Sequence, residues 1–466
     1  MNETNRYAAS VRNSLPPLLM LGLFFATLTK GAASEIHVPS DYPSIQSAVD
    51  AAHSGDVIIV APGRYTGRVT IRDKGLTITS TDPGNPAVVA QTILGAGNDE
   101  YQVYAIVFER KQAHSLPSAE LSGFSFGRYG VVFSGMNGTI SHCIFARGPS
   151  SIVADNGARC YVVLNTFCGT IGHIYANDSD VVLEGNTMVG MGSSDGIVLV
   201  YDGAAFISNS VISCSRVWRS IVTCMQSDLV LSQTIVAANT NEGYDVPVGI
   251  RADNAVIMGC TIVGNKRATG SSYGVAGWVS LFMCNTICRG NASPGGYEVL
   301  SGRCRIESCN IEGGRDQVSS NDLTWGPGNI DADPLFVDPG RWDGDTFIPG
   351  DYRLLPGSPC IDAGTNDVDN PGTTPIEVLP NTDLAGLPRV IDGDLDGAAT
   401  VDIGAYEYLP GDVNYDGRVN ILDLIAIRAS LGQDPSSSPA ARKADANADG
   451  RVNIEDLIMV RGRLGK

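Results

Sequence analysis

Long apolar runs are missing from this 466-residue sequence once its first 30 residues have passed. The longest run, Leu18–Leu28, has 11 residues. A helix that spans a bilayer needs about 20 residues. We therefore expect a protein that does not span a membrane.

Basic residues are also scarce. Lys and Arg number 32 against 50 Asp and Glu, so the net charge is −18 and the isoelectric point is near 4.6. Because nucleic-acid binding needs a basic face, we expect no nucleic-acid partner. The acidic balance fits an exported protein and the binding of hard cations. Only 18% of residues are charged and 54 are Gly, as in a turn-rich β protein.

Cysteines are absent from both ends of the sequence, and all eleven lie between Cys143 and Cys360. Their spacings do not form the paired Cys-x-x-Cys knuckles of a zinc site. Several fall inside the repeats described below, where they read as small buried apolar residues. Disulfides after export are the alternative. The number is odd, and the pairing cannot be deduced from sequence.

The N-terminal segment, residues 1–34, resembles a secretory signal peptide. Arg6 and Arg12 precede the apolar run, and Ala32-Ala33-Ser34 supplies small residues for cleavage. We expect cleavage near residues 33–34, a mature chain starting near Glu35, and a secreted or cell-surface location.

Helical spacing and the Leu-x-x-Leu-x-Leu pattern are missing from residues 130–312, which instead repeat one short unit eight times. Each unit opens with a small residue and a β-branched pair, as in Gly130-Val131-Val132. Each ends in the signature x-[Thr/Ser/Asn/Cys]-[apolar]-x. The second position of the signature falls at Cys143, Thr166, Thr187, Ser210, Thr234, Thr261, Thr286 and Asn310, in steps of 21 to 27 residues.

A period of this length indicates stacked repeats. Units rich in Val, Ile and Thr and interrupted by Asp, Asn and Gly predict two or three short strands joined by turns. The prediction is an all-β solenoid, a parallel β-helix with one coil per repeat. The first signature position holds Asn165, Asn186, Asn209, Gln233 and Asn285. Stacked amides at a turn hydrogen-bond the neighbouring coils, so we interpret this column as structural.

Residues 35–97 predict a cap on the first coil. Ser44 is a good N-cap, and Ile45, Val49 and Ala52 then form one apolar helix face. Strands are predicted at 57–60, 69–71 and 76–79. A helix here would cover the open end of the solenoid.

This segment resembles the start of the pectin-lyase-like right-handed parallel β-helix proteins of secreted bacterial origin. The matching residues are Val38-Pro39, Asp41-Tyr42-Pro43, Ile45-Gln46, Ala48, Ala51-Ala52, Gly55-Asp56 and Ala61-Pro62-Gly63-Arg64-Tyr65. With the repeats, the resemblance covers residues 35–315 and implies a right-handed β-helix domain over 35–330. That fold hosts lyases, hydrolases, esterases, epimerases and non-enzymes, so it does not specify the chemistry.

Residues 331–410 break the period. They look like the terminal segment of secreted β-helix proteins, and we interpret them as the last coil and a C-terminal cap. Asp392, Asp394 and Asp396 alternate there as carboxylates that could hold a further Ca²⁺. Ile403 stands where a twelfth-position acid would be expected. An Asp/Gly turn without metal is the alternative.

Residues 411–466 contain two acidic loops 33 residues apart, "DVNYDGRVNILD" and "DANADGRVNIED". Their oxygen ligands match the EF-hand positions that hold Ca²⁺, with a Gly at the sharp turn. The first loop offers Asp412, Asn414, Asp416, the Arg418 carbonyl, Asn420 and Asp423. The second offers Asp445, Asn447, Asp449, the Arg451 carbonyl, Asn453 and Asp456. One apolar helix face follows each loop: Leu424, Ile427, Leu431 and Leu457, Val460, Leu464.

Asp at the twelfth position of both loops departs from the EF-hand and resembles a type I dockerin domain. The resemblance covers 411–466 and implies two calcium ions and a cohesin-type partner on a scaffold or cell surface. In that family, loop positions 10 and 11 help to choose the partner. Here they are Ile421-Leu422 and Ile454-Glu455, where well-known members often carry a hydroxyl pair.

No catalytic motif stands out in the β-helix. An enzyme of this fold would place its site on the outer face of one sheet, and polar residues that could line a groove are Asp195, Asp202, Asp245, Arg251, Asp253, His173 and Tyr175. Solvated turn residues are the alternative, so the catalytic residues stay unknown. The two resemblances imply carbohydrate degradation, as a glycoside hydrolase or lyase, because dockerins mostly occur with carbohydrate-active modules and β-helix proteins often cleave acidic glycans. The alternative is a non-catalytic carbohydrate-binding or cell-surface structural protein.

Overall fold

The computed structural model describes residues 33–95, 104–111, 118–127, 129–146, 151–169, 172–193, 195–243, 249–267, 272–292, 295–343, 346–368 and 380–465. The predicted signal peptide therefore lies outside the described residues except for its last two. The described chain forms two compact units: the first holds residues up to 230 and 250–254, and the second holds 231–249 and the described residues from 255 onward. No helix in these ranges is long and apolar enough to cross a membrane.

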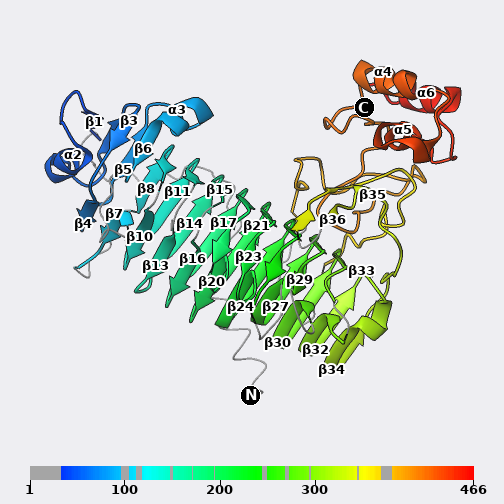
Figure 1. Cartoon of the computed structure of the whole chain (residues 1–466), viewed down its shortest axis with the longest axis horizontal. Helices are drawn as coiled ribbons and strands as arrows, with labels where there is room; N and C mark the ends of the chain where they lie inside the picture. Colours follow the sequence, from blue (N-terminus) through cyan, green and yellow to red (C-terminus); the bar gives the residue numbers. More distant parts are fainter. Residues whose placement is uncertain are drawn as a thin grey trace. The chain divides into compact units, whose positions relative to one another are not determined.

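A typical coil of the first unit carries three short strands, and some coils add a fourth, because β-branched and aromatic runs alternate with turn residues. One coil contains β13 (Ile152–Asp155), β14 (Arg159–Val163) and β15 (Thr166–Cys168). All three pair in parallel with the next coil, β16 (Ile174–Asn177), β17 (Asp180–Glu184) and β18 (Thr187–Val189). The predicted parallel β-helix is thus confirmed (Figure 1).

The remaining strands of the first unit are β1 (Glu35–Val38), β2 (Val57–Val60), β3 (Gly63–Tyr65), β4 (Val69–Arg72), β5 (Thr77–Ser80), β6 (Thr92–Leu94), β7 (Tyr104–Glu109), β8 (Ala119–Ser122), β9 (Ser125–Phe126), β10 (Gly130–Ser134), β11 (Gly138–Ser141), β12 (Ile144–Ala146), β19 (Gly192–Ser193), β20 (Val198–Tyr201), β21 (Ala204–Ser208), β22 (Val211–Ser213) and β23 (Arg216–Val217). Two strands, β24 (Val222–Ser232) and β27 (Ile250–Met258), begin in the first unit and end in the second.

The second unit adds β25 (Ile235–Ala237), β26 (Thr240–Asn241), β28 (Thr261–Val263), β29 (Lys266–Arg267), β30 (Tyr273–Cys284), β31 (Ile287–Arg289), β32 (Tyr297–Glu307), β33 (Asn310–Ile311), η1 (Gly314–Gln317), β34 (Val318–Trp325), β35 (Phe336–Asp338), β36 (Arg341–Asp343), β37 (Thr346–Ile348), β38 (Asp351–Leu354), α4 (Ile421–Ser430), η2 (Pro435–Ser437), α5 (Pro439–Ala444) and α6 (Ile454–Arg461). Its coils repeat the parallel pairing, for example between β30 and β32.

Helix α2 (Ile45–Ala51) caps the first coil as predicted. Ser44 and Ser47 form a capping box, and Ile45 and Val49 are buried where the helix packs on β1, β2 and β4. The three predicted strands of this segment are present: β2 has the predicted bounds, and β4 and β5 have ends shifted by one residue. The short helix α3 (Pro86–Gln91) was not predicted.

Aromatic rings stack along the interior of the first unit. Phe126, Phe145 and Phe167 lie on successive coils with centroid distances of 4.7 and 4.6 Å. Phe108 and Phe133 stack in the same way at 4.8 Å. Such stacks follow from the coil repeat, because equivalent residues lie one strand spacing apart.

The predicted amide column is correct for two of its members. The N–H of Cys143 donates to Asn165 Oδ1 at 2.9 Å, and the N–H of Asn165 donates to Asn186 Oδ1 at 3.0 Å. The N–H of Asn186 in turn donates to Ser210 Oγ at 3.1 Å. This buried side-chain ladder holds the corner between adjacent coils.

The other three members of that column lie one residue earlier, so the predicted register is wrong there. Asn209, Gln233 and Asn285 have φ of 47°, 42° and 48°. They occupy the left-handed corner itself, a conformation that Asn adopts more readily than most residues. The repeat length varies between coils, and alignment by residue type merged two adjacent columns into one.

A second amide ladder, which was not predicted, lies inside the second unit. The N–H of Asn239 donates to Asn265 Oδ1 at 3.2 Å, and that of Asn265 donates to Asn291 Oδ1 at 3.0 Å. Glu298 ends the ladder by accepting the N–H of Asn291 at 2.9 Å. Burial raises the pKa of Glu298.

The described residues between 331 and 410, which we call the cap, follow the coils and contact the side of the second unit. Strands β35 and β38 pair antiparallel. The N–H of Thr365 donates to Asn285 Oδ1 at 2.8 Å, and that of Ala405 donates to Thr261 Oγ1 at 3.1 Å. The buried side chains of Arg389 and Glu407 meet in the cap, with Arg389 Nη1 2.8 Å from Glu407 Oε1.

All eleven cysteines lie among the described residues, and no disulfide joins any of them. Nine are buried, Cys168 is exposed and Cys214 is half-buried. Burial raises the pKa of Cys143 and Cys160 to about 12. The nine buried cysteines therefore fit the first of the two interpretations made from the sequence, small buried apolar residues.

Candidate functional site

The first acidic loop leads directly into α4. Asn420 caps the helix and forms a capping box with Asp423. The fully buried Asp423 carboxylate accepts the N–H groups of Val413, Asn414 and Asn420 at 2.9, 3.1 and 2.8 Å. The last acid of the loop is therefore fixed against its beginning.

The other predicted ligands of this loop converge on the same place. Asp412 accepts the N–H groups of Asp416 and Gly417 at 3.1 and 2.8 Å. Asp416 Oδ2 lies 3.1 Å from Asn414 Nδ2 and 3.3 Å from Asn420 Nδ2. Burial, and then repulsion from neighbouring carboxylates, raises the pKa of Asp412. A cation would relieve that repulsion, so the residues fit a hard divalent ion.

The second loop repeats this arrangement before α6. Asn453 and Asp456 form its capping box, and Asp456 is fully buried. Asp445 accepts the N–H groups of Asp449 and Gly450 at 3.1 and 2.9 Å. Asn447 Oδ1 accepts the N–H of Asp449 at 3.1 Å. Both copies thus place carboxylate and amide oxygens around one point.

The predicted apolar faces of α4 and α6 are only partly correct. Ile427 and Val460 are fully buried in the core of the module. Leu431 and Leu464 are exposed, because α4 ends at Ser430 and α6 at Arg461, before the third predicted position of each face.

The outer sides of the same helices carry exposed apolar side chains. They are Ile421 (61% exposed), Leu422 and Ile425 on α4, and Ile454 (62%) and Ile458 on α6. Ile421 and Ile425 correspond to Ile454 and Ile458 in the 33-residue repeat. We call these five side chains the apolar face of the module. Exposed apolar groups that gather on one surface often mark a binding site.

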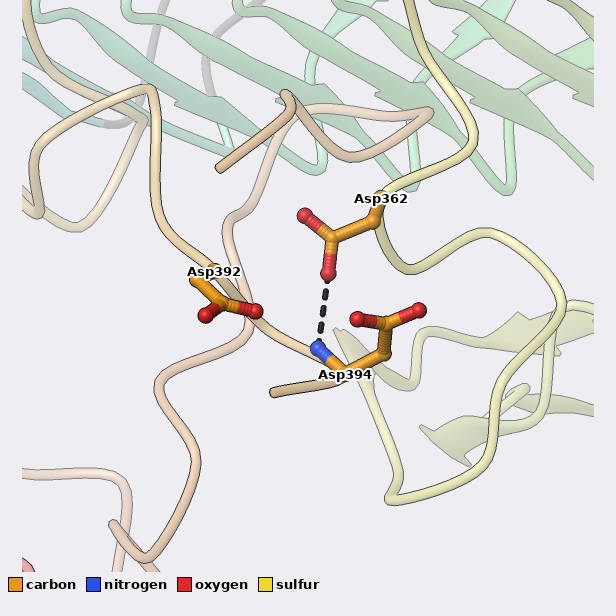
Figure 2. A group of neighbouring side chains, drawn as sticks. All are labelled: Asp362, Asp392 and Asp394. Atoms are coloured by element: carbon orange, nitrogen blue, oxygen red, sulfur yellow. Dashed lines mark hydrogen bonds between the residues drawn. The ribbon is translucent and has the colours of Figure 1, made fainter. Parts of the chain in front are cut away.

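A third acidic group lies in the cap, but its membership differs from the prediction. Asp362, Asp392 and Asp394 each bring a carboxylate oxygen within 4.8 Å of the others (Figure 2). Asp362 Oδ2 accepts the N–H of Asp394 at 2.7 Å. Asp396 is not part of the group and accepts the N–H of Ala398 instead. Asp362 could not be found from the sequence, because it lies thirty residues before the Asp/Gly run.

Three of the side chains considered for catalysis lie together on the first unit. Asp195 Oδ1 lies 3.4 Å from Arg219 Nε. The ring of His173 meets Tyr175 edge-on at 6.0 Å, and Tyr175 lies 5.9 Å from Tyr201. Burial lowers the pKa of His173, and the nearby Asp195 opposes this. We call these five side chains the aromatic patch.

Asp202 belongs to a different place. It lines a polar pocket together with Asp178, Asp180 and Arg159. Arg159 Nη2 lies 2.6 Å from Asp180 Oδ2, so two of these charges offset each other. The structure therefore does not gather Asp195 and Asp202 into one described site.

The remaining candidates are only partly described. Asp253 accepts the N–H of Gln226 at 2.7 Å, which is a structural contact. Arg251 lies on β27 and is half-buried. Asp245 lies outside the described residues. We assign none of these side chains a catalytic role.

Comparison with known proteins identifies the C-terminal module. Residues 410–465 match the family model described as the dockerin type I domain. The chain thus carries a dockerin type I domain at its C-terminal end. No curated protein matches the chain.

The solved structures that are similar to the chain include a pectate lyase and an alginate epimerase. Pectate lyase Pel9A is 12% identical with a TM-score of 0.32, over 82% of this chain and 98% of that one. The periplasmic alginate epimerase AlgG is 11% identical with a TM-score of 0.25, over 59% of this chain and 75% of that one.

Proposed function

We propose that this protein is a secreted β-helix protein that acts on polysaccharide and is attached through its dockerin domain, in a calcium-dependent way, to a cohesin-type partner. The observation that carries the proposal is the duplicated acidic loop, in which matching side chains converge in both copies. The attachment surface lies within residues 411–466. The partner is a cohesin-type domain on a scaffold or cell surface.

Two calcium ions are held by the loops. The ligands are Asp412, Asn414, Asp416, the Arg418 carbonyl, Asn420 and Asp423 in the first, and Asp445, Asn447, Asp449, the Arg451 carbonyl, Asn453 and Asp456 in the second. Each set offers six residues, within the range of six to eight oxygens that Ca²⁺ takes. Bound calcium neutralises the clustered carboxylates and holds each helix start in place. A further ion lies near Asp392 and Asp394, with Asp362 in place of Asp396.

The apolar face supplies the contact with the partner. Ile421, Ile425, Ile454 and Ile458 are exposed although each is a large aliphatic side chain. Their burial against a partner would release about 25 cal/mol per Å² of apolar surface. The partner surface is therefore apolar opposite these positions, in place of the polar contacts that a hydroxyl pair would make.

Polysaccharide binds the aromatic patch of the β-helix. Tyr175 and Tyr201 offer half-buried rings on adjacent coils, and rings of this kind combine a large apolar surface with a polar tip. The Asp195–Arg219 pair beside them can bond sugar hydroxyls. If the protein is an enzyme, it is a hydrolase of O-glycosyl bonds or a polysaccharide lyase. The second candidate function is carbohydrate binding without cleavage, as part of a cell-surface structure.

The attachment is tested by titrating the full chain against a panel of type I cohesin domains in a calorimeter, with Ca²⁺ and with EDTA. We expect binding to at least one domain in Ca²⁺ and none in EDTA. The double variant I425S/I458S should weaken binding by about tenfold or more, since hot-spot side chains contribute about 2 kcal/mol each. Equal binding in EDTA, or no binding to any domain, would contradict the proposal.

The carbohydrate function is tested on the same chain with a polysaccharide panel. Absorbance at about 235 nm detects lyase products, and reducing ends without absorbance indicate a hydrolase. Binding without cleavage supports the non-catalytic candidate. Tyr175→Ala should abolish binding or cleavage, whereas Tyr297→Ala, in a ring pair of the second unit, should not. No binding to any glycan by a folded chain would overturn the carbohydrate function.

A further inference from the structure

One side chain of the first calcium loop, Tyr415, forms a hydrogen bond with the cap. Its hydroxyl donates to the carbonyl of Leu354 on β38 at 2.7 Å. In return, Arg353 Nη1 donates to the carbonyl of Tyr415 at 3.0 Å. Two hydrogen bonds of opposite direction therefore join β38 to the loop.

Two cations flank the ring of Tyr415. The Arg353 guanidinium lies 4.7 Å from the ring centroid, and the Lys443 ammonium of α5 lies 4.9 Å from it. Both distances are within the range of cation–π attraction. Arg353 is oriented by Asp351, whose Oδ1 lies 2.8 Å from Arg353 Nε. The ring is thus held by a cation of the cap and by a cation of the module.

The orientation of the Tyr415 ring depends on the backbone conformation of the first loop. Tyr415 is the fourth loop residue, between Asn414 and Asp416, two residues whose side chains point to the proposed ion. Its φ is 59°, in the left-handed region that a non-glycine residue adopts only when its surroundings hold it there. A cation that fixes the loop also fixes the ring against β38.

The second loop has the same backbone at this position but no ring. Ala448 has a φ of 57°. A Cβ placed on Gly357 of the cap would lie 3.0 Å from the Ala448 methyl group, so the two backbones approach closely. The second loop only packs against the cap, whereas the first loop is hydrogen-bonded to it.

We infer that Tyr415 fastens the dockerin domain to β38 of the cap, so that the domain is held as a rigid part of the second unit while calcium occupies the first loop and is released when calcium leaves. The inference rests on the proposed calcium binding and adds an intramolecular partner, the chain's own cap. The apolar face does not take part in this contact. It stays exposed while the loop is fastened, so the cohesin partner and the cap use different surfaces of the domain.

The test is hydrogen exchange of the full chain, followed in peptides that cover residues 351–355, which contain none of the proposed calcium ligands. With Ca²⁺ these amides should be protected, and chelation should speed their exchange by about fivefold or more, the factor expected when one or two hydrogen bonds are lost. Tyr415→Ala and Arg353→Gln should exchange at the faster rate already in Ca²⁺ and should respond little to EDTA. Arg341→Gln, at an exposed arginine of β36, is the matched control and should behave as the unaltered chain.

Arg353 is not a calcium ligand, so its variant keeps the loop intact and the test valid even if Tyr415→Ala does not fold. A calcium titration of each variant checks this. If chelation alters residues 411–465 but leaves 351–355 unchanged, or if both variants still respond to EDTA as the unaltered chain does, the inference is overturned and the proposed function stands. If chelation alters neither region, the inference is overturned, and the calcium titration of the unaltered chain shows whether the proposed calcium binding fails as well.

Discussion

The β-helix and the C-terminal domain both repeat a short unit, but they stabilise it with different chemistry. Each coil forms hydrogen bonds with the next coil through its backbone strands. Side-chain ladders, such as that of Cys143, Asn165, Asn186 and Ser210, add further hydrogen bonds between coils. The donors and the acceptors of these hydrogen bonds all belong to the protein itself. The acidic loops instead collect carboxylates, and burial, followed by repulsion from neighbouring carboxylates, raises the pKa of Asp412.

The two regions therefore obtain their stability from different sources. The β-helix buries stacked aliphatic and aromatic side chains over many coils, so it has a large core of its own. The core of the C-terminal domain contains eight buried residues, among them Val413, Ile427 and Val460. A core of that size seldom supports an independent fold without a metal or disulfide. The comparison predicts that the two regions respond differently to almost every perturbation.

Calcium removal should have the largest effect, and only on the domain. Calcium at about 100 times its Kd stabilises a fold by about 2.7 kcal/mol per site, hence about 5 kcal/mol for two sites. EDTA should therefore unfold α4, α5 and α6 and leave the coils unchanged. Far-ultraviolet circular dichroism combined with hydrogen exchange of the full chain checks this. Retained protection within residues 411–465 in EDTA would show that the domain is stable without metal.

The cap should lose stability as the pH rises. Burial raises the pKa of Asp402 from 3.8 to about 7 and that of Glu407 to about 10, the latter opposed by Arg389. A folded state that retains a proton is favoured at low pH. The stability contributed by Asp402 is complete below about pH 3.8 and is lost as the pH rises to about 7, a loss of about 4 kcal/mol at most.

Hydrogen exchange of residues 400–408 at pH 5 and pH 8, corrected for intrinsic exchange, measures this loss. Calcium is kept in excess at both values so that the loops do not contribute. Asp402→Asn should show a smaller difference between the two pH values, although it also loses one acceptor of the N–H groups of Asp362 and Tyr408. An equal difference in the variant would assign the pH dependence to other groups.

The acidic loops could be located from the sequence because the residues proposed as calcium ligands lie close together in the chain, and calcium binding by these residues stays a prediction. Fixed spacing within twelve residues determines which oxygens converge, and the structure brings the predicted side chains together in both copies. The β-helix was predicted from its period for the same reason, since every coil repeats one local pattern. The register of the amide column was not predictable, because coil lengths vary from 21 to 27 residues and Asn occurs in two adjacent columns.

Contacts between segments that are far apart in the chain could not be predicted from the sequence. Asp362 joins Asp392 and Asp394 because the cap folds back on itself. The contact of Tyr415 with Leu354 spans 61 residues and depends on how the domain packs. No spacing rule relates such positions. The error at Leu431 and Leu464 was local instead: the periodic apolar pattern predicted helices that continue past the residues where α4 and α6 end.

Breaking the ladder should weaken the β-helix by a smaller amount than calcium removal weakens the domain. Asn186 accepts the N–H of Asn165 and donates to the carbonyl of Val162 at 2.6 Å. Asn186→Ala leaves both groups buried without this partner and should cost about 1–3 kcal/mol. The exposed Asn177→Ala, on the neighbouring strand β16, should change stability by less than about 0.5 kcal/mol. Denaturant unfolding in EDTA isolates the β-helix, and equal effects of the two variants would refute a role for the ladder.

The smallest effect on stability is expected from a substitution in the apolar face of the C-terminal domain. Ile425 and Ile427 lie on the same helix, but Ile425 is exposed and Ile427 is fully buried. Ile427→Ala should cost about 2–5 kcal/mol, whereas Ile425→Ser should change the stability of the calcium-loaded domain by less than about 0.5 kcal/mol. Thermal unfolding in excess Ca²⁺ measures both. A large loss from Ile425→Ser would mean that this side chain packs within the chain, and the apolar face would then be part of the fold, with its role in partner binding excluded.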